Sequence, residues 1–151
     1  MRHPRKAFSL IEVMAVVVLL AVVASSSFML APTFATRSMQ AASESRKLVT
    51  ALRLTRQTAL ASQTPVRLRL IASPRTITGY VVEQQSASGF IPLMPEETLT
   101  GLPTITSNAN SILFSPTGSA DVSIVISLGT GRQNHRVSVI AGTGMVRYVR
   151  S

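Results

Sequence analysis

The chain has 151 residues, a formal net charge of +9 and no cysteine. Its length allows one domain with a modest core, and the lack of cysteine excludes disulfides, so packing alone must hold the fold. The basic balance permits contact with acidic lipids or nucleic acid, but a small excess of arginine is more typical of solvated surface.

The N-terminus combines a basic start with a long apolar segment. Residues 1–6, MRHPRK, carry three basic side chains and no acid, and from Phe8 to Ala31 the only ionisable side chain is Glu12. A helix over this range would be about 36 Å long, which spans a hydrocarbon core of about 30 Å with some tilt. The positive-inside rule leaves the basic start in the cytoplasm and sends the rest outward. We therefore predict a transmembrane helix over residues 8–31.

Glu12 needs a partner, because an ionised carboxylate near the middle of a membrane helix costs about 2.5 to 3.5 kcal/mol. A secretory signal is the alternative, but its apolar region is about 7 to 15 residues long and ends in a small-residue cleavage site. Here the small residue, Ala7, precedes the apolar run. Cleavage between Ala7 and Phe8 would remove a leader, residues 1–7, and create an α-amine on the helix face of Glu12. The two groups could neutralise each other within one chain or between chains.

The stretch AFSLIEVM, residues 7–14, resembles the type III signal of type IV pilins and type II secretion pseudopilins. The usual form of that signal is Gly followed by Phe-Thr-Leu-Ile-Glu, so this chain departs from it at Ala7 and Ser9. The resemblance implies that a prepilin peptidase cuts before Phe8 and methylates its amine. It also implies that Glu12 pairs with the N-terminus of a neighbouring subunit during assembly. A plain membrane anchor that is never processed is the alternative.

A second helix is predicted over residues 32–63. Pro32 should bend or weaken the first helix, and Pro65 should end the second. Between them, residues 43–62 place apolar side chains at a period near 3.6, with most basic side chains on the other face. Together, residues 8–63 predict one long helix with a lipid half and a water half. The predicted apolar stripe consists of Leu48, Val49, Leu52, Ala59 and Leu60.

After Pro65 the apolar period changes to two, which predicts strands in residues 64–151. Short strands without a further helix favour an α+β fold, in which an antiparallel sheet or small two-sheet sandwich packs on the water half of the helix. Residues 95–111, rich in Thr, Ser, Asn and Pro, are predicted as a mobile loop. The predicted strands are VRLRLI (66–71), TITGYVVEQ (76–84), GFIPLM (89–94), SILFS (111–115), VSIVISL (122–128), HRVSVIA (135–141) and MVRYV (145–149).

Three further stretches are similar to the minor pseudopilin H and fimbrial T-type minor pilin family. They are an Arg-x-x-Ala-Leu element at residues 56–60, ILFSPTGSA at 112–120 and VSVIAGTGMVR at 137–147. The resemblance implies a pilin-like fold and a minor pseudopilin of a type II secretion system. Such a subunit is held in the bacterial inner membrane with its β domain in the periplasm. Its partners are prepilin peptidase, an inner-membrane assembly platform and the other pseudopilins, with which it forms a helical fibre that drives protein export.

The basic C-terminus offers a competing function. Some fimbrial T-type pilins bind DNA for uptake through a Gly-Arg-x-Arg motif, but here the match stops at Gly131 and Arg132. Residues three apart on a strand also point to opposite faces. We therefore favour a solvated surface, and keep a DNA-uptake pilin or a membrane-anchored binding domain as alternatives. The candidate nucleic-acid contacts are Arg132, Arg136, Arg147 and Arg150, with Tyr148 available for stacking.

Motifs for catalysis and metal binding are not evident in the sequence. The two histidines are His3 in the leader and His135, which the pattern places in a solvated turn. With no cysteine and six widely spaced acids, neither a transition-metal cluster nor a calcium loop is expected. P-loop, dinucleotide and Gly-x-Ser-x-Gly motifs are also missing. The sequence thus predicts a protein that is not an enzyme and needs no cofactor.

Overall fold

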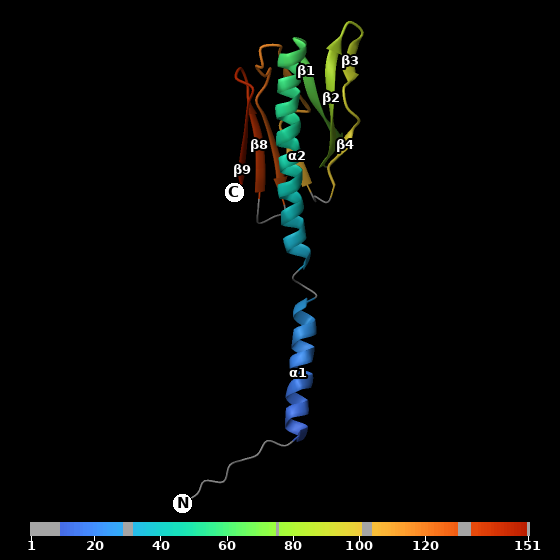
Figure 1. The fold of residues 1–151 in the computed structure, drawn as a ribbon, viewed down its shortest axis with the longest axis vertical. Coiled ribbons are helices and arrows are strands. Elements are labelled where there is room, and N and C mark those ends of the chain that lie inside the picture. Colours follow the sequence, from blue (N-terminus) through green and yellow to red (C-terminus); the bar gives the residue numbers. More distant parts are fainter. Residues whose placement is uncertain (1–9, 29–31, 75, 101–103, 130–133, 151) are drawn as a thin grey trace, which may run out of the picture. The chain divides into compact units, whose positions relative to one another are not determined.

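The computed structural model describes residues 10–150 apart from 29–31, 75, 101–103 and 130–133. Within these residues, two helices precede nine strands (Figure 1). The chain forms two compact units, Met1–Thr36 and Arg37–Ser151.

The first helix, α1, spans Leu10–Phe28 and consists mainly of aliphatic residues. Between residues 10 and 23 its large apolar side chains are all exposed, from 51% at Val13 to 81% at Leu10. A helix that is apolar all round is normally buried by lipid or by other helices. Among the residues that the structure describes, no helix is both long and apolar enough to cross a membrane.

The second helix, α2, spans Pro32–Ser62 and begins at the predicted break. Proline suits the first helical position, because it has no N–H to leave unpaired and its φ is already helical. Of the long helix predicted over residues 8–63, the structure describes the two segments α1 and α2, and residues 29–31 lie outside the described residues. At the other end Gln63 has a φ of 52°, a left-handed conformation typical of helix ends, and Pro65 follows. The helix ends at Ser62, one residue before the predicted bound at residue 63.

One face of α2 closes the hydrophobic core. Leu48, Leu52 and Ala59 are fully buried, as the apolar stripe predicted. The inclusion of Leu60 in that stripe is wrong, because it lies about 100° around the helix from Ala59 and is 38% exposed. Thr55 is also buried, and its hydroxyl donates a hydrogen bond of 2.7 Å to the carbonyl four residues earlier. The buried face of α2 therefore holds a polar side chain whose hydroxyl is paired within the helix.

Two antiparallel sheets form the β region, which is the two-sheet form of the predicted α+β fold. Sheet A has the order β3-β2-β1-β6, with β4 also paired to β2, and sheet B has the order β5-β7-β8-β9. The strands of sheet A are β1 (Val66–Ser73), β2 (Thr76–Ser86), β3 (Gly89–Pro92), β4 (Glu97–Thr98) and β6 (Ser111–Phe114), and those of sheet B are β5 (Thr104–Ser107), β7 (Ile124–Gly129), β8 (Asn134–Ile140) and β9 (Met145–Arg150).

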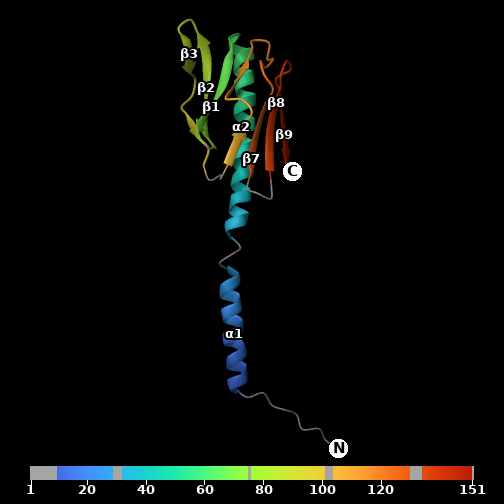
Figure 2. The same cartoon turned by 180° about the vertical axis from the view of Figure 1, so that it is seen from behind.

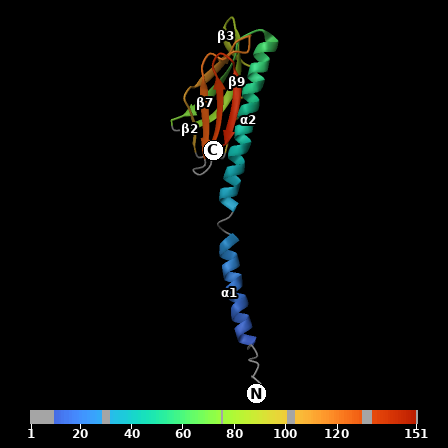
Figure 3. The same ribbon diagram turned by 90° about the vertical axis from the view of Figure 1, so that its left-hand side faces the viewer.

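The two sheets share one core with α2. In Figures 1 and 2, α2 runs between β1–β3 of sheet A and β8–β9 of sheet B, and Figure 3 shows the strands on one side of the helix. Alternate residues of β1, β6, β7 and β8 face inward, among them Leu68 and Phe114 from sheet A and Ile126 and Val137 from sheet B, all fully buried. Burying each such side chain contributes about 1.5 to 3 kcal/mol, so a domain without disulfides depends on this joint core.

The prediction of a mobile loop over residues 95–111 is wrong, because β4 and β5 lie within this range. Ile105 of β5 is 1% exposed and belongs to the core. Its N–H donates to the hydroxyl oxygen of Thr76 at 2.9 Å, and β5 pairs along its length with β7. Threonine suits an extended strand as well as a loop, so composition alone could not separate the two.

The three stretches that resemble minor pseudopilins meet around Arg56 of α2. Its Nε donates to the carbonyl of Gly118 at 2.8 Å, and its Nη2 donates to that of Thr143 at 3.3 Å. The turn at Gly144, which has a φ of +63°, packs directly on the Gly118 carbonyl. A Cβ on Gly144 would lie 2.1 Å from that oxygen. Arg56 therefore holds two turns against α2, the one at Gly118 and the one at Gly144, which pack on each other.

Replacing Gly144 tests this junction, and Gly142 provides a matched control. Both glycines have positive φ, but a Cβ on Gly142 would meet no atom within 4 Å. Gly142→Ala should cost about 1 to 2 kcal/mol of unfolding free energy, from backbone strain alone. Gly144→Ala adds the backbone clash, so its cost should exceed about 3 kcal/mol. Urea unfolding followed by circular dichroism measures both, and equal costs would contradict the close packing of the two turns.

Candidate functional site

Glu12, the predicted assembly residue, lies in the first turn of α1 with its side chain exposed. A carboxylate is favoured there because the N-terminal end of a helix carries partial positive charge. Three other predicted site residues, Ala7, Phe8 and Arg132, lie outside the described residues. The pairing of Glu12 with an amine on Phe8 therefore stays a prediction.

The arginines of the C-terminal strands do not form one patch. The register of β8 and β9 pairs Ser138 with Arg147 and His135 with Arg150. Because side chains alternate along a strand, Arg136 and Arg147 share the outer face of sheet B, while Arg150 lies on the opposite face. Three of the four candidate contacts are described, and at most two of them can face one ligand.

His135 lies within the strand predicted over residues 135–141, but the expectation that its side chain is solvated is wrong, because the residue is buried. It is 1% exposed on β8, and its Nδ1 lies 2.6 Å from the Tyr148 hydroxyl, with the two rings stacked. Burial, followed by the positive charge of Arg150, lowers the pKa of His135. In the part of the chain that the structure describes, no group of three or more possible ligands could hold a metal ion. Tyr148 thus packs on His135, which limits its ability to stack on a base.

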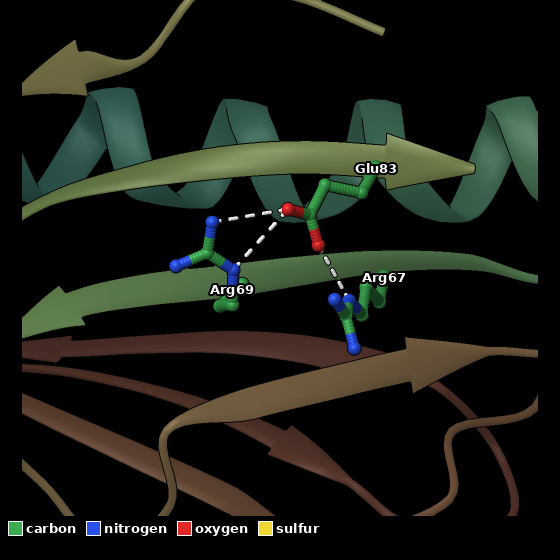
Figure 4. Close-up of polar contacts among 3 residues, drawn as sticks. All are labelled: Arg67, Arg69 and Glu83. Carbon is green, nitrogen blue, oxygen red and sulfur yellow. Dashed lines mark hydrogen bonds and ion pairs between the residues drawn. The ribbon is translucent and has the colours of Figure 1, made fainter. Parts of the chain in front are cut away.

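The outer face of sheet A carries a buried carboxylate between two arginines (Figure 4). Glu83 of β2 is 5% exposed and lies opposite Arg67 of β1, whose Nε is 2.5 Å from Oε2. Arg69 donates to Oε1 from Nε and Nη2, at 3.2 and 3.1 Å. The Arg67 guanidinium also lies over the Phe90 ring, 3.7 Å from its centroid. These contacts fasten β1, β2 and β3 together on the face away from the core.

The arginines decide the charge state of Glu83. Burial would raise the pKa of Glu83, but hydrogen bonds from Arg69 and Arg67 outweigh it and hold that pKa below its ordinary value of 4.5. Sequence reasoning missed this cluster, because the period of two in VRLRLI predicts a strand but does not show which residue lies opposite Arg67. The Arg-x-Arg spacing was a usable signal, but only the register of β1 and β2 places Glu83 beside it.

Comparison with solved structures defines the class as pilin-like. The minor pseudopilin EpsH from the type 2 secretion system of Vibrio cholerae matches with a TM-score of 0.62 at 15% identity, covering 73% of this chain and 96% of EpsH. The type IV minor pilin FimU of Pseudomonas aeruginosa PAO1 matches with a TM-score of 0.63 at 15% identity, covering 76% and 91%. At this identity the likeness concerns the fold.

Family models identify the group within this class. A model described as type II transport protein GspH matches residues 44–144, and a model of the prokaryotic N-terminal methylation motif matches residues 2–28. The chain therefore belongs to the GspH family. No curated protein matches its sequence. The pilin-like resemblance predicted from the sequence is confirmed, and the family is one of structural pseudopilin subunits.

Replacing Glu83 tests the cluster on sheet A. Glu83→Gln should lower the unfolding free energy near neutral pH by about 1 to 2 kcal/mol, since charged hydrogen bonds are lost while the arginines stay partly solvated. Because folding lowers the pKa of Glu83, the ionised carboxylate contributes its whole stabilisation above pH 4.5. That contribution is lost as the pH falls below 4.5. The loss of unfolding free energy caused by Glu83→Gln should therefore be smaller at acidic pH.

Glu96→Gln is the matched control, because Glu96 is exposed on the same sheet region. Its cost should stay within about 0.5 kcal/mol at every pH. Urea unfolding at several pH values measures both variants, and a cost for Glu83→Gln that does not change with pH would contradict the assigned charge state.

Proposed function

We propose that this chain is a minor pseudopilin of a type II secretion system, processed by prepilin peptidase and assembled into the periplasmic pseudopilus that drives protein export. The observation that carries the proposal is the GspH family match over residues 44–144. The fold supports it, because EpsH is a minor pseudopilin. FimU shares the fold, so the fold alone does not separate secretion from pilus systems, and the family description, a type II transport protein, is what favours secretion.

Processing and anchoring follow from the N-terminal segment. The methylation-motif match over residues 2–28 supports cleavage between Ala7 and Phe8 and methylation of Phe8. Residues 8–31 then anchor the chain in the inner membrane, and residues 64–151 lie in the periplasm. The chain is stored in this state until the assembly platform adds it to a fibre.

Assembly gives the apolar surface of α1 a partner. Its large apolar side chains between residues 10 and 23 are exposed on every side of the helix, at half or more of their area. Each one gains about 1.5 kcal/mol or more when it leaves water, so a free α1 is unfavourable outside lipid. Helices of neighbouring subunits bury the same surface in a fibre. Glu12 then pairs with a neighbour's Phe8 amine, which removes the cost of an isolated carboxylate.

DNA uptake is a weaker alternative. Duplex binding near physiological salt needs several phosphate contacts made together, because each contact is individually weak. Arg136 and Arg147 share a face of sheet B, but Arg150 lies on the other face and Tyr148 packs on His135. The described arginines thus offer too few aligned contacts for tight binding, and the role proposed is assembly and not catalysis or nucleic-acid binding.

The N-terminus of the mature protein is the first test. In cells that contain the peptidase, mass spectrometry should find a chain that begins at a methylated Phe8. Ala7→Gly restores the usual residue and should be cleaved at least as completely. An intact Met1 in cells that process other pseudopilins would contradict the proposal.

Glu12→Ala is the second test, because insertion and assembly should change in opposite directions. Removing the carboxylate eases membrane insertion by about 2.5 to 3.5 kcal/mol, while leaving a neighbour's amine unpaired. Membrane fractionation should show full insertion, and protein export should fall. Val13→Ala, which changes the same turn without changing charge, is the control and should support export. If Glu12→Ala exports as well as the unmodified chain, the pairing role is wrong.

A further inference from the structure

A basic pocket of about 480 Å³ lies between α2 and the start of β9 with the turn that precedes it. Arg53, Arg56 and Gln57 line it from α2, and their spacing places them on one side of the helix. Residues 143–146 line it from the turn and from β9. Among the described lining residues two side chains are cationic and none is acidic. The pocket therefore offers positive charge without a counter-ion of its own.

The guanidinium of Arg56 is fixed in place within this pocket. Its Nε donates to the carbonyl of Gly118 and its Nη2 to that of Thr143, and the residue is half-buried. Both acceptors are neutral, and Nη1 has no hydrogen-bond partner among the described residues. A partly desolvated cation with only neutral partners is stabilised by an anion beside it. Because the guanidinium is already ordered, binding such an anion costs little side-chain entropy.

Arg53 supplies a second cation, which is exposed. It forms no hydrogen bond through its side chain and no ion pair with any residue that the structure describes, whereas Arg67 and Arg69 are both ion-paired. The side-chain amide of Gln57 also lacks a partner within the described part of the chain and adds a neutral donor. Guanidinium groups present parallel N–H donors that match the two oxygens of a carboxylate. The α2 side of the pocket is thus suited to an oxyanion.

The other side of the pocket is partly apolar, which favours a protein carboxylate over a phosphate. Met145 is 42% exposed and Val146 is half-buried, and both line the pocket. An Asp or Glu within a partly apolar segment could place its oxygens at the arginines and its apolar neighbours on Met145. A phosphodiester would leave the apolar side without a matching contact. The combination of walls therefore indicates a polypeptide partner.

We propose that this pocket binds the carboxylate of an Asp or Glu side chain on a neighbouring pseudopilin, with Arg53 and Arg56 as its partners. The proposal rests on the proposed function and names the surface and the chemistry of the partner. A basic segment would be repelled by the two arginines, and an uncharged segment would cover Arg56 without supplying a counter-ion. Charge complementarity thus selects an acidic occupant.

The test places a photo-crosslinking amino acid at Gln57, which is exposed and lines the pocket. The full chain is expressed in its own membranes with the secretion system present. Illumination should yield an adduct with another pseudopilin, and mass spectrometry should place the link close to an Asp or Glu. Ile91, which is 50% exposed on β3 outside the pocket, is the control position. Any adduct formed from Ile91 should not depend on Arg53.

Charge variants decide whether Arg53 recognises the acid. Arg53→Glu should lower the Gln57 adduct about tenfold or more, and Arg53→Gln should lower it less, because only the first adds repulsion. Replacing the linked acid of the partner with Arg should restore the adduct with Arg53→Glu, because the charges of the pair are then exchanged. Arg136→Glu makes the same change of charge on the outer face of sheet B and should leave the Gln57 adduct unchanged.

These variants should accumulate and resist protease like the unmodified chain, since both arginines are exposed. A Gln57 adduct that Arg53→Glu leaves unchanged would overturn the proposal. A link to lipid only, or a linked segment without an acid, would overturn it as well.

Failure of the pocket is distinguishable from failure of the function. If deleting the gene stops export and the full chain restores it, but Gln57 links to no pseudopilin, the proposed docking is wrong while the function holds. If deletion leaves export unchanged and no position of the chain links to a pseudopilin, both proposals are overturned.

Discussion

The β domain depends on one buried face of α2, because that face closes a core to which both sheets contribute. Leu48, Leu52 and Ala59 meet inward-facing residues from β1, β6, β7 and β8. Neither sheet could bury its apolar face without the helix, and no disulfide could compensate, since the chain has no cysteine. The polar contacts of Arg56 hold two turns against the same helix. The clustered Arg67, Glu83 and Arg69 secure sheet A from its outer face.

The two units of the chain meet different requirements. The described side chains of α1 are exposed apolar groups apart from Glu12, whereas α2 buries one stripe and exposes its charges. A folded domain can stay in water while an apolar helix needs lipid or neighbouring helices. This division suits a subunit that is stored in a membrane and later transferred to a fibre. In the proposed function, Glu12 makes that transfer selective, because a carboxylate is costly in lipid and useful only beside a cation.

Much of the fold could be predicted because it depends on local pattern. The helix ends follow from Pro32 and Pro65, and the alternation of β1 follows from Val66, Leu68 and Leu70. What the sequence could not predict depends on register and on tertiary burial. β5 was hidden because its one buried residue, Ile105, sits among polar neighbours.

The same limit applies to the polar sites. His135 was expected to be solvated, yet the pairing of β8 with β9 places Tyr148 against it, and it is buried. Glu83 became part of a cluster only through the register that sets it opposite Arg67. Glu44 and Glu97 are far apart in sequence and meet at Lys47 only after α2 packs on sheet A. Sites made by long-range pairing thus escaped a pattern-based prediction, whereas the N-terminal motif, which is contiguous, did not.

The central claim is that α1 packs against other pseudopilins, and site-directed disulfide crosslinking tests it most directly. Because the chain has no cysteine, Val16→Cys in α1 introduces its sole thiol. Membranes would be oxidised while each of the other pseudopilins in turn carries a single cysteine in its own N-terminal helix. The account predicts a heterodimer band with at least one of them, present when the secretion system is complete and lost with Glu12→Ala. A Val16→Cys chain that remains monomeric with every partner, in cells that export normally, would contradict it.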